Sequence, residues 1–205
     1  MHEYLFIPAK ESRAAPLVLL HGSDGRETDM IPFGERLMPS AAKISIRGAV
    51  ATPGGFAFFQ RFADRRIDEQ DLAARVSPLS EVIRTALSEH GLVRRPVVVG
   101  FSNGAIMAAA MLRTEHEMFS SAILLRPLSP FAVGPEQPLN ALPVLLVDGA
   151  HDKRRNPGDG QLLAETLRQA GADVHHEVLP TGHLIGDLDE QIAARWMRAN
   201  ATFKS

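Results

Sequence analysis

The chain has 205 residues, of which 45% are hydrophobic and 22% are charged, and its formal net charge is −2. This length and composition are typical of one globular domain with a substantial core. The small charge and the lack of long basic runs provide no electrostatic basis for binding nucleic acid. The chain has no cysteine, which excludes disulfides, thiolate metal ligands and a cysteine nucleophile.

The N-terminal sequence lacks the basic region and the long apolar stretch of a secretion signal. No apolar run approaches the roughly 18 residues that a membrane-spanning helix requires. We therefore expect a cytoplasmic protein without integral membrane contact.

Short apolar runs recur along the chain and predict strands. Runs such as LVLL, VVVG and VLLV are apolar at every position, which is typical of parallel strands covered on both faces. The predicted strands are Tyr4–Ile7, Leu17–His21, Lys43–Ile46, Val97–Phe101, Ala122–Leu125, Val144–Val147 and Val174–Leu179.

Apolar residues at helical spacing occupy several of the intervals between these strands. They recur every three or four residues in Leu79–Leu87, Leu163–Ala170 and Leu188–Trp196. Alternating strands and helices predict a single three-layer α/β domain over residues 1–205. Its mostly parallel central sheet has about seven strands, helices on both faces and no large lid domain.

Two long segments lack helical spacing and are predicted as loops. Gly48–Arg66 has a Pro-Gly-Gly turn and four phenylalanines, and Arg126–Pro143 is rich in proline. Loops of this length in a compact domain are often functional, so we expect both to wall a shallow substrate cleft. For the apolar residues of this wall the candidates are Phe56, Phe58, Phe59, Leu128 and Phe131. The alternative for each of them is that its side chain packs on the core.

Two arginines in these loops have two possible roles. Arg61 and Arg126 can bind a substrate anion or pair with Asp64 or Asp68. Of these two roles we expect pairing.

The segment Gly100-Phe101-Ser102-Asn103-Gly104 is a G-x-S-x-G motif directly after a predicted strand and before an alanine-rich helical stretch. In a nucleophile elbow the serine lies on a strained strand-to-helix turn, where bulky neighbours two residues away would clash. Gly100 and Gly104 relieve that clash. The alternative is that Ser102 is an ordinary helix N-cap, but the placement of the motif favours the elbow.

A serine nucleophile needs a neutral imidazole to accept its proton. His183 lies between the last predicted strand and the last predicted helix. This is the carboxyl edge of the sheet, where ligands bind in open α/β folds. The other histidines considered fall inside a strand (His175 and His176) or at exposed or helix-end positions (His2, His90 and His116).

An acidic residue after the preceding strand is expected to orient this imidazole. The strand Val144–Val147 leads to Asp148 and Asp152. Asp152 lies in the loop beyond the strand end, so we predict it as the carboxylate partner, with Asp148 as the alternative. His151 is expected to be a solvated loop residue.

A serine hydrolase also needs two backbone N–H donors for the oxyanion. One is expected from Asn103, the residue after the nucleophile. The other is expected from Ser23, since the sharp turn at Gly22 follows the second predicted strand.

These motifs resemble those of the phospholipase/carboxylesterase family of small α/β-hydrolases. The segments around Arg47-Gly48, Phe58–Arg61 and Ile67–Leu72 are similar to the bacterial subgroup that includes hydroquinone-induced hydrolases. The resemblance extends from about Leu17 to Trp196. It implies the triad Ser102, Asp152 and His183, and the oxyanion amides of Ser23 and Asn103.

The resemblance also implies hydrolysis of small to medium acyl esters through an acyl-enzyme, without a metal or organic cofactor. The expected partner is a small-molecule ester, and family members are often homodimers. A thioesterase or lysophospholipase-type deacylase stays open as an alternative, as does a non-catalytic ligand-binding hydrolase fold. The chain departs from the family pattern at Lys153–Pro157, where many relatives have a proline and a hydrophobic pair.

Overall fold

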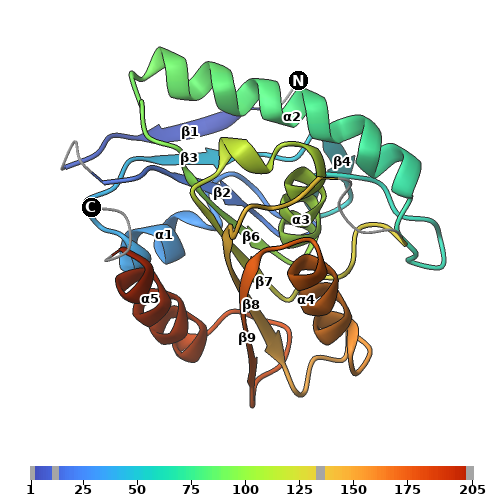
Figure 1. The fold of residues 1–205 in the computed structure, drawn as a ribbon. Helices are drawn as coiled ribbons and strands as arrows, with labels where there is room; N and C mark the ends of the chain where they lie inside the picture. Colours follow the sequence, from blue (N-terminus) through green and yellow to red (C-terminus); the bar gives the residue numbers. More distant parts are fainter. Residues whose placement is uncertain (1–2, 11–13, 133–136, 202–205) are drawn as a thin grey trace.

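The centre of the fold is a seven-stranded sheet with the order β1-β3-β2-β6-β7-β8-β9 (Figure 1). The computed structural model describes residues 3–10, 14–132 and 137–201. All neighbouring strands in this sheet are parallel except β1 and β3. Each of the seven predicted strands is confirmed, with the bounds β1 (Tyr4–Ile7), β2 (Leu17–Leu20), β3 (Lys43–Ile46), β6 (Val97–Phe101), β7 (Ser121–Leu125), β8 (Pro143–Gly149) and β9 (Asp173–Leu179).

Helices cover both faces of this sheet (Figure 1). Along β6, Val98 packs into the core that α2, α3 and α4 share, whereas Val97 and Val99 pack with α1 and α5. Because successive strand residues point to opposite faces, continuously apolar strands need a helical layer on each side. The predicted three-layer α/β architecture is confirmed. The helices are α1 (Ile31–Leu37), α2 (Glu69–Glu89), α3 (Asn103–Thr114), α4 (Asp159–Gln169) and α5 (Asp187–Ala201), with the 3₁₀ helix η1 (His116–Met118).

Helix α2 begins at Glu69, well before the expected start at Leu79. Pro78 lies inside the helix, and since proline disfavours a helix interior, the sequence pattern suggested a later start. The helix nevertheless continues through it, because Asp68 caps the first turn and Leu72 is fully buried in the core. None of the helices in the described ranges is long and apolar enough to cross a bilayer.

We had expected the segment Gly48–Arg66 to be a loop without regular structure, but it contains a β-hairpin. Strands β4 (Val50–Thr52) and β5 (Gly55–Ala57) pair in antiparallel fashion. Three-residue strands are too short to give a periodic signal in the sequence. An isolated bridge between Gly25 and Phe56 ties the hairpin to the loop after β2, which fixes it beside the carboxyl end of the sheet.

Candidate active site

Ser102 lies on the tight turn between β6 and α3, with φ 50° and ψ −105°. This backbone conformation is strained for a residue with a side chain, and such strain is typical of a nucleophile elbow. A Cβ on Gly100 would lie 2.4 Å from the Gly104 carbonyl oxygen, and one on Gly104 would lie 2.3 Å from the Leu20 carbonyl oxygen. The steric reason predicted for both glycines is therefore confirmed.

The structure brings Ser102, His183 and Asp152 together in one hydrogen-bonded chain. The Nε2 atom of His183 lies 3.0 Å from the Ser102 Oγ, and its Nδ1 atom lies 2.7 Å from the Asp152 Oδ2. Asp152 and His183 follow β8 and β9, whose carboxyl ends are adjacent in the sheet. Since the Asp152 carboxylate can only accept, Nδ1 carries the proton and Nε2 is free to accept the serine proton.

The surroundings of these side chains favour a neutral imidazole and an ionised carboxylate. Burial lowers the pKa of His183, and the charges of Arg155 and Arg154 act in the same direction, against the opposing effect of Asp152. Burial opposes ionisation of Asp152, but the hydrogen bonds from His183 and the Arg154 N–H lower its pKa. The pair is thus ready to accept a proton at Nε2 near neutral pH.

The two expected oxyanion donors are on the same cleft as Ser102. Asn103 is the first residue of α3, so its N–H has no acceptor within the helix. Neither the Asn103 N–H nor the Ser23 N–H donates to an acceptor in the described parts of the chain. Both amides are therefore available to a ligand.

A buried histidine that the sequence did not single out fixes the loop of the second donor. The Nδ1 atom of His21 donates to the Gly22 carbonyl at 2.6 Å, and its Nε2 accepts from the Gly48 N–H at 2.9 Å. The His21 carbonyl accepts from the Gly104 N–H at 3.0 Å. These bonds connect the exit of β2 to the start of α3 and hold the two amides relative to one another.

The alternative acid, Asp148, has a different partner. Its Oδ2 lies 2.7 Å from the Nε2 of His176, a strand histidine whose side chain is largely buried. A Cβ on Gly160 would overlap the Asp148 carboxylate, so this side chain lies under the start of α4 and away from His183. His151 is exposed, as expected of a solvated loop residue.

A cleft of about 1110 Å³ opens above Ser102. Two of the five predicted wall residues, Phe59 and Leu128, line it. The predictions for the other three are corrected. Phe58 is fully buried with its ring against His21, and Phe56 lies beneath the Arg47 guanidinium.

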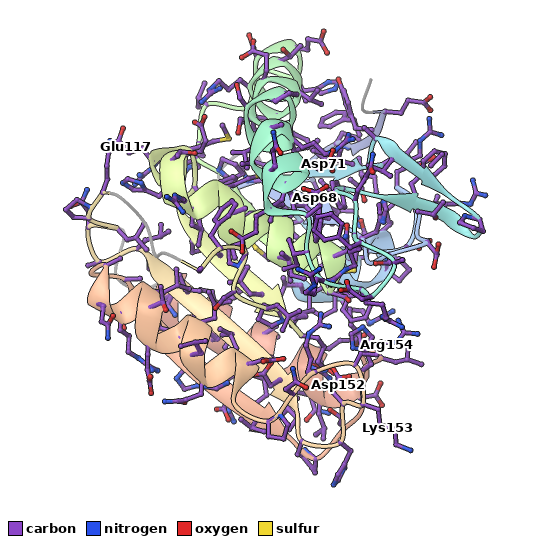
Figure 2. All side chains as sticks on the ribbon, turned by 90° about the vertical axis from the view of Figure 1, so that its right-hand side faces the viewer. Asp68, Asp71, Glu117, Asp152, Lys153 and Arg154 are labelled. Atoms are coloured by element: carbon purple, nitrogen blue, oxygen red, sulfur yellow. The ribbon has the colours of Figure 1, made fainter. Side chains whose placement is uncertain are left out.

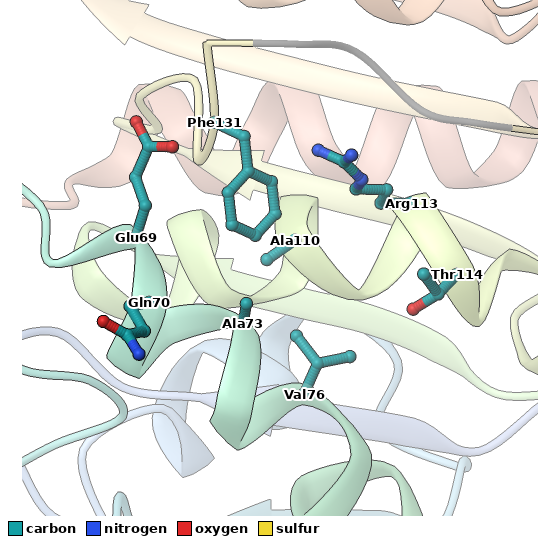
Figure 3. Close-up of a pocket in the computed structure, with 8 residues that line it drawn as sticks. All are labelled: Glu69, Gln70, Ala73, Val76, Ala110, Arg113, Thr114 and Phe131. Atoms are coloured by element: carbon teal, nitrogen blue, oxygen red, sulfur yellow. The ribbon is translucent and has the colours of Figure 1, made fainter.

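Phe131 lines a different pocket, between α2 and α3 (Figure 3). This pocket has a volume of about 480 Å³, and Phe131 projects into it above Ala110 and near Arg113. The sequence could not separate these cases, because a phenylalanine in a loop gives no signal of the direction in which its ring points.

We had expected Arg126 to pair with Asp64 or Asp68, but it pairs with neither. Its guanidinium is fully buried and forms two bonds to the carboxylate of Asp189, at 2.7 and 3.0 Å. It also donates to the Gly182 carbonyl at 2.9 Å and to the Thr181 Oγ1 at 3.0 Å. Arg126 therefore holds the loop that carries His183.

Arg61 also lacks the expected carboxylate partner. Its Nη1 donates to the Arg65 carbonyl at 2.7 Å, and its guanidinium lies 5.5 Å from the Phe59 ring centroid. Asp64 pairs instead with Arg66, and Asp68 caps α2. The charge of Arg61 therefore faces the cleft unpaired among the described residues.

His116 is buried in η1, although we had expected an exposed or helix-end histidine. Neither of its ring nitrogens has a hydrogen-bond partner among the residues that the structure describes. Within the same described residues, no group of three or more histidine, aspartate and glutamate side chains could hold a metal ion.

Comparison with known proteins places the chain among the hydrolases. No family model matches it. "Putative hydrolase MhqD" of Bacillus subtilis is 33% identical to it over 184 residues, which cover 89% of this chain and 92% of that protein. The chain belongs to the phospholipase/carboxylesterase family of α/β-hydrolases. As a member of this carboxylesterase family it is a hydrolase of the esterase class.

Two further relatives agree with this assignment to the carboxylesterase family. "Esterase YpfH" of Escherichia coli is 27% identical and matches 96% of this chain and 88% of its own. The crystal structure of the Bacillus cereus carboxylesterase superposes with a TM-score of 0.91 at 29% identity, covering 97% of this chain and 95% of the other. The chain thus extends over nearly the full length of these proteins.

Proposed function

We propose that the protein is a serine carboxylesterase that hydrolyses small to medium acyl esters through an acyl-enzyme intermediate. The observation that carries this proposal is the 3.0 Å contact between the Ser102 Oγ and the His183 Nε2, on a strained elbow and with Asp152 behind the imidazole. A helix N-cap serine would instead bond to its own helix, and Ser102 has no such side-chain bond.

The proposed reaction uses each member of the site in turn. His183 takes the proton of Ser102 as the Oγ attacks the ester carbonyl, and the Ser23 and Asn103 amides bind the oxyanion. The imidazolium then protonates the departing alcohol, which leaves an ester bond between the acyl group and Ser102. His183 activates water to release the acid, while Asp152 stabilises the charged imidazole.

A series of p-nitrophenyl esters from acetate to dodecanoate tests the proposed substrate range. The cleft is wide, but only Phe59 and Leu128 of the predicted apolar residues line it. We expect kcat/KM to be highest at two to about eight acyl carbons and to fall for longer chains, because charged and polar residues make up much of the cleft lining and leave little apolar surface for further methylenes. A steady rise up to dodecanoate, or faster turnover of a matched long-chain thioester, would favour the deacylase alternative.

The pH dependence of kcat/KM on a neutral ester tests the role of His183. Protonation of Nε2 removes the base, so activity is lost as the pH falls through the pKa of this histidine. Because burial lowers that pKa below the ordinary value of 6.5, we expect the midpoint of the acid limb below pH 6.5 and a level profile from there to neutral pH. A midpoint above 6.5, measured between pH 4.5 and 8, would contradict this account of the base.

A further inference from the structure

Five arginines and four carboxylates line the cleft above Ser102, and the two half-buried arginines, Arg155 and Arg61, have no carboxylate partner among the described residues. Elsewhere in the protein, buried or half-buried arginines face carboxylates at close range, as Arg126 does with Asp189 and Arg75 with Asp71. Arg155 is half-buried in the wall of the cleft, yet it has no carboxylate within salt-bridge distance among the described residues. It comes from the loop after β8, whose residues Asp152 to Arg154 are labelled in Figure 2.

Neutral acceptors hold the Arg155 guanidinium in place. Its Nε donates to the carbonyls of Arg126 and Pro127, both at 3.0 Å, and its Nη1 donates to the Arg154 carbonyl at 3.1 Å. Its Nη2 lies 3.2 Å from the Ser102 Oγ. These bonds fix the position of the charge beside the reacting oxygen without neutralising it.

The pKa of the Arg155 guanidinium also reflects the lack of a carboxylate bonded to it. Burial lowers the pKa of Arg155 to about 10; the charge of Arg61 acts in the same direction, and the carboxylates of Asp152, Asp159 and Asp148 oppose it. The carboxylate that attracts it most, that of Asp152, already accepts from His183. Desolvating a charge is costly unless an opposite charge compensates it. An anion bound beside Arg155 would therefore compensate the charge of its guanidinium.

Arg61 adds a second charge to the same wall. Burial lowers its pKa, and so does the neighbouring charge of Arg65. Two neighbouring guanidinium groups that repel one another are stabilised together by one anion bound to both.

Three polar side-chain atoms on the same cleft also lack partners. The Thr52 Oγ1, the Asn103 Nδ2 and the Ser129 Oγ are all buried and have no hydrogen bond among the described residues. Buried polar atoms are normally hydrogen-bonded. All three can donate a hydrogen bond, so the residues around the cleft carry more donors than the described residues satisfy.

We propose that the cleft selects esters that carry a carboxylate close to the scissile carbonyl, and that Arg155 and Arg61 bind this carboxylate. The proposal rests on the proposed esterase function and names its substrate class. Arg61, whose Nε and Nη2 donate to no acceptor among the described residues, can bind a carboxylate through two parallel hydrogen bonds. Arg155 has one N–H of its Nη1 left for the same carboxylate, because its other N–H groups donate to the Arg126, Pro127 and Arg154 carbonyls and to the Ser102 Oγ. Because Arg155 touches the Ser102 Oγ, the bound carboxylate lies only a few bonds away from the carbonyl under attack.

Two methyl esters of the same shape but different charge test the proposal. Monomethyl succinate ends in a carboxylate, whereas methyl levulinate ends in a neutral methyl ketone; both release methanol and consume one water. We expect the wild-type kcat/KM to be at least about tenfold higher for the succinate ester. Equal values, or a preference for the levulinate ester, would overturn the proposal.

Substitution then assigns the preference to its residues. Arg155→Gln is expected to lower the ratio of the two kcat/KM values about tenfold, and Arg61→Gln is expected to lower it several-fold. The matched control is Arg84→Gln, which removes the same charge from an exposed helix position paired with Glu115, and should leave the ratio unchanged. If Arg155→Gln does not fold, the Arg61→Gln variant and the wild-type ratio of the two kcat/KM values still test the proposal.

Calorimetric titration of the Ser102→Ala variant with monomethyl succinate and methyl levulinate separates this proposal from the esterase function. The ligands in this titration are the intact esters, which the variant does not hydrolyse, because the free acid levulinate also carries a carboxylate. We expect monomethyl succinate to bind, methyl levulinate to bind at least about tenfold more weakly, and Arg155→Gln to remove the difference. Turnover of both esters without any charge preference would contradict the proposed anion site but would still support the esterase function. Binding of monomethyl succinate that depends on Arg155, without turnover of either ester by the wild type, would support the anion site and contradict the esterase function.

Discussion

Replacing Ser102 by alanine is expected to lower kcat for ester hydrolysis by about 10⁵- to 10⁶-fold, the loss seen when a triad nucleophile is removed. The substitution deletes the Oγ that lies 3.0 Å from the His183 Nε2. It keeps the Cβ of this small, buried side chain, so the packing around it changes little. Thermal unfolding should therefore stay close to that of the wild type. Steady-state kinetics on p-nitrophenyl butyrate, with a purified variant, provides the measurement.

The matched control for this variant is Ser88→Ala. Ser88 lies exposed on α2, so kinetic parameters should equal those of the wild type. If Ser102→Ala lost less than about tenfold in kcat, the serine would not be the nucleophile, and the residual turnover would have to come from another group.

The second large effect is expected at the buried pair of Arg126 and Asp189. Both side chains are fully buried and bond to one another, and Asp189 also accepts from the Gly186 N–H at the start of α5. Asp189→Asn would leave the Arg126 charge without its counter-charge, and breaking such a pair costs about 3–5 kcal/mol. Urea unfolding should report this loss as a lower midpoint.

Two further variants separate the pair from the general effect of substitution. The exposed pair of Arg36 and Glu190 provides the control, since Arg36→Met should shift the midpoint far less. The double variant Arg126→Met/Asp189→Leu should recover part of the loss in stability, because no buried charge is left alone. If Asp189→Asn unfolded at the wild-type midpoint, the pair would not stabilise the His183 loop.

The parts of the site that the sequence predicted depend on local constraints. The elbow needs glycines two residues on either side of Ser102, because a Cβ at either place would meet backbone. The carboxyl ends of β8 and β9 bring Asp152 and His183 together through the register of neighbouring parallel strands. Such constraints are visible in residue spacing and strand order.

The parts that the sequence missed depend on contacts between distant residues. The carboxylate partner of Arg126 is 63 residues further along the chain, on α5, and residue spacing alone could not distinguish it from Asp64 or Asp68. Phe58 and Phe59 are neighbours in the same loop, yet of the two only Phe59 reaches the cleft. Arg155 appeared in the sequence only as a departure from the family pattern, and its contact with Ser102 required the fold.

The most direct test of the account is to label the pure protein with a fluorophosphonate and locate the adduct by peptide mass. Such a probe reacts only with a serine that an adjacent base activates. We expect one adduct per chain, on the peptide that contains Ser102, with parallel loss of ester turnover and no labelling of His183→Ala. Folded protein that stays unlabelled, or carries the adduct on another residue, would contradict a catalytic role for this triad.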